Sequence, residues 1–141
     1  MPVNHTSHRR RIYLWATVLT VAAGLSVRYV PLGLPWIVMN YAGSALCAMM
    51  IYWVLALNWP RRDAASLAVI AAAIATLAEF SRLYHVGWLD AFRATLPGMV
   101  LLGRYFSARN IAAYWVAIAA AALLDEFVLR RRADTALIES K

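Results

Sequence analysis

The chain has 141 residues, of which 63% are hydrophobic and only 15% are charged. A soluble domain of this size needs more polar surface, so the composition indicates one membrane domain over residues 1–141. The net charge of +7 does not indicate nucleic-acid binding, because the arginines stand in blocks at the ends of apolar segments. The single cysteine, Cys47, excludes an intramolecular disulfide.

Four apolar segments are close to the ~20 residues that cross the hydrocarbon core of a bilayer. Pro31, Gly33 and Pro35 follow the first segment, and Asp63 is expected to cap the third helix. The segments are too long and too rich in alanine and leucine for barrel strands. The sequence therefore predicts an all-α membrane protein with four transmembrane helices, a connection between helices 3 and 4, and a cytoplasmic tail: helices at residues 12–30, 36–57, 64–84 and 110–129, the connection at 85–109 and the tail at 130–141.

The basic residues predict the orientation of these helices. One side holds arginine blocks at positions 9–11, 61–62 and 130–132 together with Lys141. Because cytoplasmic connections carry the excess of Lys and Arg, we expect a bacterial inner-membrane protein with both termini in the cytoplasm. The opposite, outer side retains five arginines against this bias: Arg28, Arg82, Arg93, Arg104 and Arg109. Either pairing with carboxylates and headgroups or a binding role explains their retention.

The outer connection at residues 85–109 is long for a protein of this size, and such loops are usually functional or disordered. Its sequence contains two short amphipathic pieces, WLDAFRAT and MVLLGRYF, on either side of Pro97 and Gly98. A segment of this kind can lie in the headgroup plane or dip back into the bilayer as a re-entrant segment. The sequence leaves both alternatives open.

Glu79 is placed inside the third apolar segment, about 7 Å below its expected outer end at Tyr84. An unpaired carboxylate is costly at that depth. Arg82 lies three residues further on and shares a helix face with Glu79, while Arg28 or Arg93 could reach it from neighbouring segments. The pattern is compatible with an ion pair that fixes the membrane edge and with a ligand site.

Polar residues of the outer side are expected to converge around Glu79, which favours a site for acid, base and anion chemistry. The candidate catalytic residues are Glu79, Asp90 and His85, with Glu79 or Asp90 as the general base. These three are too few and too irregularly spaced for a metal site, a Ser81–His85–Asp90 triad lacks a nucleophile elbow, and no cofactor motif occurs, so neither metal nor cofactor is predicted. The candidate ligand-binding residues are Glu79, Arg82, Asp90, Arg93, Arg104, Asn110 and Tyr114.

Residues 79–123 resemble the signature half of the domain-of-unknown-function family 2809, short four-helix membrane proteins similar to the VanZ-like group. Arg82 stands where that pattern has Gln, and Asn110 where it has Asp, so the site is two charge units more positive than the pattern implies. The resemblance implies the four-helix topology, and it implies no reaction, since the family has none assigned. The matching residues are Glu79, Phe80, Ser81, Leu83, Tyr84, Leu89, Asp90, Arg93, Thr95, Leu102, Gly103, Phe106 and Tyr114.

Three functional hypotheses follow. The first is a binder of an anionic cell-envelope lipid or lipid-linked precursor, in which Arg82, Arg93 and Arg104 contact the anion. The second is a membrane enzyme for the same substrate class with Glu79 or Asp90 as general base. The third is a structural or transporter subunit with a membrane protein partner or a second copy of itself. Asp125 and Glu126, near the cytoplasmic end of the fourth segment, are interpreted as charge matching at the membrane boundary.

Overall fold

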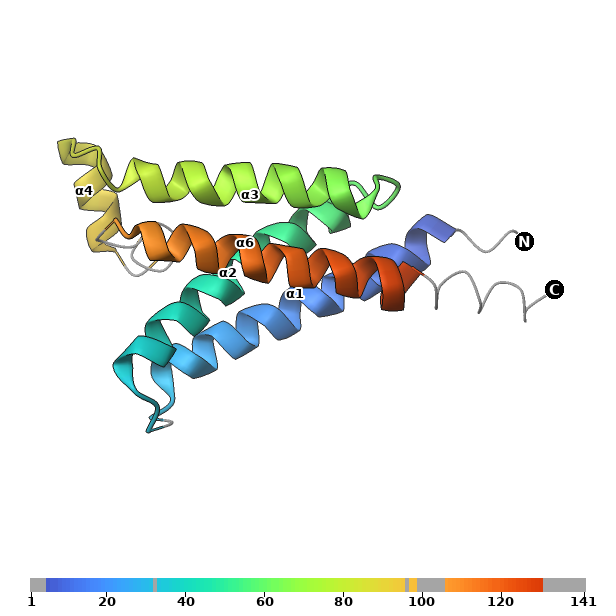
Figure 1. The fold of residues 1–141 in the computed structure, drawn as a ribbon, viewed down its shortest axis with the longest axis horizontal. Coiled ribbons are helices and arrows are strands. Elements are labelled where there is room, and N and C mark those ends of the chain that lie inside the picture. Colours follow the sequence, from blue (N-terminus) through green and yellow to red (C-terminus); the bar gives the residue numbers. More distant parts are fainter. Residues whose placement is uncertain (1–4, 32, 96, 99–105, 131–141) are drawn as a thin grey trace.

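The computed structural model describes residues 5–31, 33–95, 97–98 and 106–130, and within these ranges it is all-helical, with no strand (Figure 1). Its four long helices are each apolar and long enough to cross a membrane, which confirms the predicted multi-pass α-helical fold. A short helix follows the third of them, and a π-helical turn extends the last. The elements are α1 (His5–Tyr29), α2 (Trp36–Asn58), α3 (Ala64–Ser81), α4 (Gly87–Ala94), α6 (Ala108–Leu124) and η1 (Asp125–Arg130).

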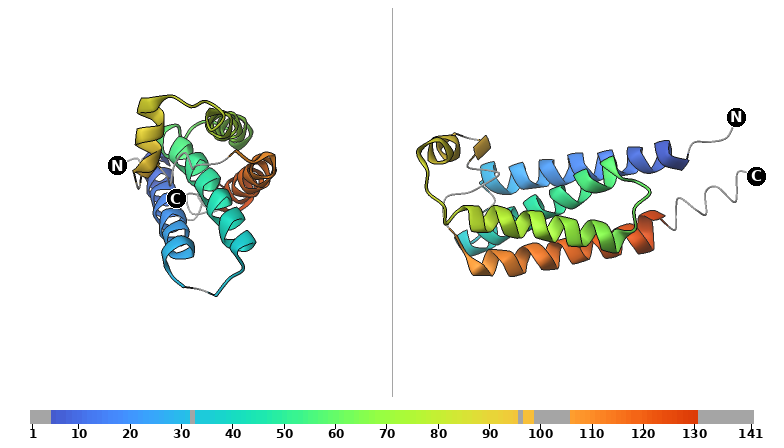
Figure 2. Two further views of the ribbon diagram at one scale, coloured as in Figure 1. Left: turned by 90° about the vertical axis from the view of Figure 1, so that its left-hand side faces the viewer. Right: turned by 90° about the horizontal axis from the view of Figure 1, so that it is seen from above.

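The long helices run back and forth, so that the chain has two distinct ends (Figures 1 and 2). The start of α1, the α2–α3 turn and η1 lie at one end, which we call the terminal end. The α1–α2 turn, α4 and the start of α6 lie at the other, which we call the α4 end. Helix α2 packs against α1, α3 and α6, and α3 packs against α6. This topology separates the charged residues of the chain into two groups at opposite ends of the bundle.

Local sequence explains where the helices begin and end. Gly33 adopts φ 65° in the α1–α2 turn, a left-handed conformation that costs little only for glycine. Pro35 precedes the first residue of α2, where its missing N–H is no loss. Asp63 caps α3 as predicted, because its carboxylate accepts a hydrogen bond from the backbone N–H of Ser66 at 2.7 Å.

Aromatic and small residues form the buried centre of the bundle. The ring of Trp53 stacks on Tyr13, with centroids 6.3 Å apart, and meets the edge of Tyr52 at 5.0 Å. Helices α3 and α6 pack against each other and bury small residues, which let helix backbones approach closely. The buried alanines in the middle of these two helices are Ala71, Ala75, Ala117 and Ala121.

Helix α3 ends at Ser81, whereas the sequence predicted helix to residue 84. The backbone N–H groups of residues 82 to 84 bond to carbonyls three residues back, so the last turn tightens before the chain turns into α4. Helix α4 corresponds to the first predicted amphipathic piece and lies across the end of the bundle, roughly perpendicular to α3 and α6 (Figures 1 and 2). Most of the second piece, 99–106, falls outside the described residues, and a re-entrant path remains a prediction.

Candidate functional site

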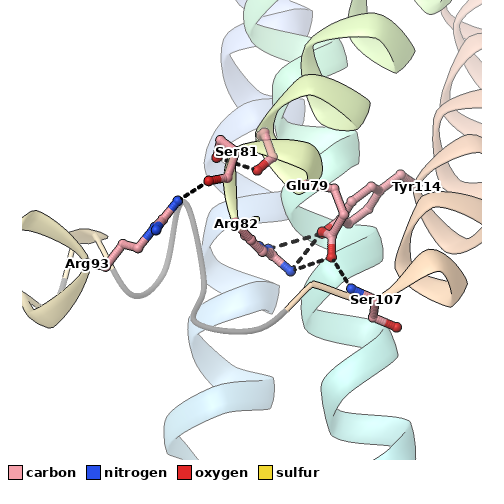
Figure 3. A network of polar contacts seen from close by, with 7 residues as sticks. Glu79, Ser81, Arg82, Arg93, Ser107 and Tyr114 are labelled. Atoms are coloured by element: carbon pink, nitrogen blue, oxygen red, sulfur yellow. Dashed lines mark hydrogen bonds and ion pairs between the residues drawn. The ribbon is translucent and has the colours of Figure 1, made fainter. Parts of the chain in front are cut away.

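A fully buried carboxylate organises the α4 end of the bundle (Figure 3). Glu79, in the last turn of α3, accepts hydrogen bonds from the Tyr114 hydroxyl at 2.6 Å and from the Ser107 backbone N–H at 2.8 Å. Arg82 Nη1 lies 2.8 Å from Glu79 Oε1 and 2.7 Å from Oε2. Arg82 Nη2 also donates to the Tyr114 hydroxyl at 3.2 Å. We call Glu79, Arg82, Ser107 and Tyr114 the Glu79 cluster.

The Glu79 cluster joins α3 to the first two turns of α6. The Glu79–Arg82 ion pair confirms the pairing expected from their spacing, and Arg82 retains 11% side-chain exposure. Both carboxylate oxygens are already hydrogen-bonded by these donors, so Glu79 has no free lone pair directed at an open space for removing a substrate proton. In this geometry, the cluster acts first as a satisfied polar contact inside an apolar bundle.

Arg93 connects α4 to the end of α3 and is only 4% exposed. Its guanidinium donates to the Ser81 carbonyl oxygen (Figure 3). It also donates to the Tyr84 carbonyl oxygen at 3.0 Å and to Asp90 Oδ1 at 3.0 Å. The Ser81 carbonyl belongs to the last residue of α3 and also accepts from the Tyr84 N–H at 3.1 Å, and the Tyr84 carbonyl lies in the turn that follows the helix. Arg93 therefore caps α3 from a neighbouring helix. Its Nε atom is buried and has no hydrogen-bond partner among the described residues.

His85 and Asp90 form a more open pair next to this cap. The His85 Nδ1 and Asp90 Oδ1 atoms are 3.3 Å apart, and both side chains are exposed. Asp90 also holds Arg93, so one carboxylate orients both an imidazole and a guanidinium. Ser81 does not join them as a nucleophile, because its hydroxyl donates to the Ala78 carbonyl at 2.6 Å.

The remaining predicted site residues are distributed around the start of α6. Tyr114 belongs to the Glu79 cluster, and Asn110 lies one helical turn before it, 5% exposed. The Asn110 Oδ1 atom has no hydrogen-bond partner within the described part of the chain. Arg104 lies outside the described residues. Arg109, an exposed side chain in the first turn of α6, was not among the predicted ligand contacts.

A second buried carboxylate lies at the terminal end. Asp125 is fully buried and accepts hydrogen bonds from the Tyr13 hydroxyl at 2.8 Å and the Tyr52 hydroxyl at 2.7 Å. The sequence interpretation of Asp125 as a charge at the membrane boundary missed this three-helix contact. The sequence did contain a signal for this contact. Tyr13 and Tyr52 lie inside apolar segments, at positions close to the same end of the bundle as Asp125. We call these three residues the Asp125 cluster.

The described residues lack the ligand set of a metal site and include groups that can contact an anion. Within the described ranges, no three His, Cys, Asp or Glu side chains gather to hold a metal ion. The exposed polar side chains at the α4 end include the His85–Asp90 pair, Arg28 and Arg109, and two buried atoms, Arg93 Nε and Asn110 Oδ1, have no hydrogen-bond partner in the described ranges. Exposed arginines of this kind can contact an anion.

A family model matches the part of the chain that contains α4 and the Glu79 cluster. No solved structure matches the chain. The model of the family described as "Protein of unknown function (DUF2809)" matches residues 33–118, which is more than half of the chain. That segment contains the whole Glu79 cluster and excludes Tyr13 and Asp125 of the second cluster. The chain therefore belongs to the family of proteins of unknown function DUF2809.

Proposed function

We propose that this multi-pass membrane protein binds an anionic envelope lipid or lipid-linked precursor at its α4 end. The observation that carries the proposal is the excess of cations there: the described arginines are Arg28, Arg82, Arg93 and Arg109, against the carboxylates Glu79 and Asp90. Glu79 and Asp90 neutralise Arg82 and Arg93. The two exposed arginines keep their charge available for a headgroup.

Helix α4 supports a position for this site at the level of the headgroups. It turns Leu89 and Arg93 toward the bundle and leaves Trp88 74% exposed. Tyr84, just before α4, is also exposed. Amphipathic helices with exposed aromatic residues settle at the boundary between lipid tails and headgroups. A headgroup beside α4 would then meet the arginines without leaving the interface.

The distribution of arginines supports an outer-leaflet position for the α4 end, with both termini in the cytoplasm of a bacterial inner membrane. The terminal end carries arginine blocks at positions 9–11 and 61–62, whereas the α4 end carries single arginines. In cells whose protein has Cys47 replaced by Ser, a membrane-impermeant maleimide should label Ala91→Cys and spare Arg61→Cys. The reverse pattern contradicts this orientation.

The lipid preference can be measured directly. The full-length protein in a neutral detergent is titrated with phosphatidylglycerol or phosphatidylcholine of identical acyl chains, and adducts are counted by native mass spectrometry. We expect half-saturation with phosphatidylglycerol at roughly tenfold lower concentration, since a charge-assisted contact contributes about 1.4 kcal/mol or more. Equal binding of the two lipids would remove the proposal.

A second candidate function is catalysis on such a lipid, favoured by the exposed His85–Asp90 pair. In that scheme Asp90 orients the imidazole, and His85 takes a proton from a water molecule that attacks the phosphodiester phosphorus and returns the proton to the departing headgroup alcohol. Glu79 is not available for this role because it is already occupied by its donors. Incubation of phosphatidylglycerol with the protein should then release a headgroup fragment, and His85→Gln should abolish release while lipid adducts persist. A subunit role with a protein partner and a relation to the VanZ-like group remain predictions.

A further inference from the structure

The first turn of α6 is electrostatically unusual for a helix N-terminus. The N-cap residue, Ser107, makes no side-chain cap bond, and no acidic residue stands in the first turn. The backbone N–H groups of Ala108 and Arg109 have no acceptor among the described residues. Helix N-termini carry a partial positive charge, and here the exposed cation of Arg109 adds to it. An anion at this turn would satisfy the N–H groups and offset the charge.

Asn110 provides an independent observation at the same turn. It occupies the third helical position, from which the Cα–Cβ bond tilts toward the helix N-terminus, and a Glu or Gln at this position often accepts a hydrogen bond from the N-cap N–H. Here the N–H of Ser107 donates instead to Glu79 Oε1 at 2.8 Å. The Asn110 Oδ1 atom is consequently left buried, 5% exposed as a residue, and without a partner in the described ranges. A buried acceptor of this kind needs a donor.

Among the described residues, Glu79 is the carboxylate bonded to the start of α6, and it does not prevent an anion from binding there. Its charge is matched by Arg82 at 2.7 Å, and its oxygens are directed at Tyr114 and Ser107. The charge that remains in the first turn of α6 belongs to Arg109 and the helix dipole. The turn thus offers N–H donors and a cation beside one buried acceptor.

We propose that the first turn of α6 binds a phosphate headgroup that also carries a free hydroxyl, such as a glycerol phosphate or sugar phosphate lipid. The phosphate oxygens accept from the Ala108 and Arg109 N–H groups and from the Arg109 guanidinium, and the hydroxyl donates to Asn110 Oδ1. This inference rests on the proposed function and narrows it. Arg93 and Arg82 position the turn through α3, and Arg109 contacts the anion.

The test compares two anionic lipids with identical acyl chains, phosphatidylglycerol and phosphatidylmethanol, by native mass spectrometry of the full-length protein. Both are phosphodiesters with a single negative charge, and phosphatidylmethanol lacks the glycerol hydroxyls. We expect phosphatidylglycerol to bind about fivefold more tightly, the effect of one additional hydrogen bond. Asn110→Leu should remove this preference and retain binding of both lipids. Equal binding of the two lipids to the unsubstituted protein would overturn the proposal.

Charge variants test the anion contact separately. Arg109→Gln should weaken both lipids about five- to tenfold, and Arg11→Gln, which removes an exposed arginine of the terminal end, should change neither more than twofold. Asn110→Asp, which places a negative charge in the first turn of α6, should weaken binding of both lipids about tenfold or more by repulsion of the phosphate. Equal effects of the two arginine variants would mean that only general electrostatic attraction operates.

Further measurements distinguish a lipid headgroup from a free phosphate ester, and distinguish failure of the proposed function from failure of the α6 site. Soluble glycerol phosphate at the lipid concentration should not displace phosphatidylglycerol, and displacement would overturn the lipid assignment in favour of a free phosphate ester. If phosphatidylcholine binds as well as phosphatidylglycerol, the proposed function itself fails. If the anionic lipids are preferred but Arg109→Gln and Asn110→Leu have no effect, the proposed binding site at the first turn of α6 is wrong and the proposed function stands.

Discussion

Replacing Glu79 by Gln tests whether the Glu79 cluster holds the α4 end together. The substitution keeps the shape of the side chain and removes the charge that balances Arg82. The new amide group places an N–H donor against groups that are themselves donors, and Tyr114 and Ser107 compete for a single carbonyl oxygen. The Arg82 cation is left without a carboxylate inside an apolar bundle.

The magnitude follows from these contacts. Removing one partner of a buried ion pair costs about 3 to 5 kcal/mol. Because Arg82 is 11% exposed and can turn toward headgroups, we expect the lower end of that range, about 3 kcal/mol, in the free energy of unfolding. In the double variant Glu79→Gln/Arg82→Gln the stranded cation is gone, so about 1 to 2 kcal/mol of the loss should return.

Reversible unfolding in mixed detergent and dodecyl sulfate micelles, followed by circular dichroism, measures these values. The control is Glu126→Gln, which removes an exposed carboxylate from η1 and should change stability by less than about 0.5 kcal/mol. The reasoning is refuted if Glu79→Gln is as mild as the control, or if the effects of the two substitutions at the Glu79 cluster simply add.

Three further substitutions address the rest of the structure. Arg93→Gln removes the hydrogen bonds that hold α4 against the end of α3, so the amides of α4 should exchange with deuterium faster. The melting temperature of the bundle should stay nearly unchanged, and unchanged exchange in α4 would contradict the role of Arg93. Gly98→Ala should destabilise the α4 connection by about 2 kcal/mol in the same unfolding assay, since a Cβ atom there would lie 1.9 Å from the Phe92 carbonyl oxygen; a neutral effect contradicts that close approach. Asp125→Asn should cost about 2 kcal/mol, and a double-mutant cycle with Tyr13→Phe should be non-additive; additive losses would mean that the two side chains do not interact.

The sequence predicted what depends on local spacing. The hydropathy pattern predicted the four long helices, and Asp63 predicted the start of α3. The three-residue separation of Glu79 and Arg82 predicted their ion pair. Each of these needs only the geometry of one helix. Three residues of the candidate set at the α4 end, Glu79, Arg82 and Tyr114, share one hydrogen-bond network.

Contacts that depend on how helices cross could not be predicted in the same way. Arg93 was predicted as an anion contact, and the structure adds hydrogen bonds from its guanidinium to two main-chain carbonyls. Every residue has such a carbonyl, so the sequence of side chains does not indicate which one is bonded. Those carbonyls are available only because α3 ends at Ser81. Asp125 was judged from its neighbour Glu126, while its partners Tyr13 and Tyr52 lie 112 and 73 residues away along the chain.

The most direct test of the central claim is hydrogen–deuterium exchange of the full-length protein in nanodiscs of phosphatidylglycerol and of phosphatidylcholine. If the α4 end binds an anionic headgroup, exchange of the Ala108 and Arg109 amides should be slower in phosphatidylglycerol, while the α2–α3 turn exchanges equally in both. Identical exchange at the start of α6 in the two lipids, or protection confined to the terminal end, would contradict the account.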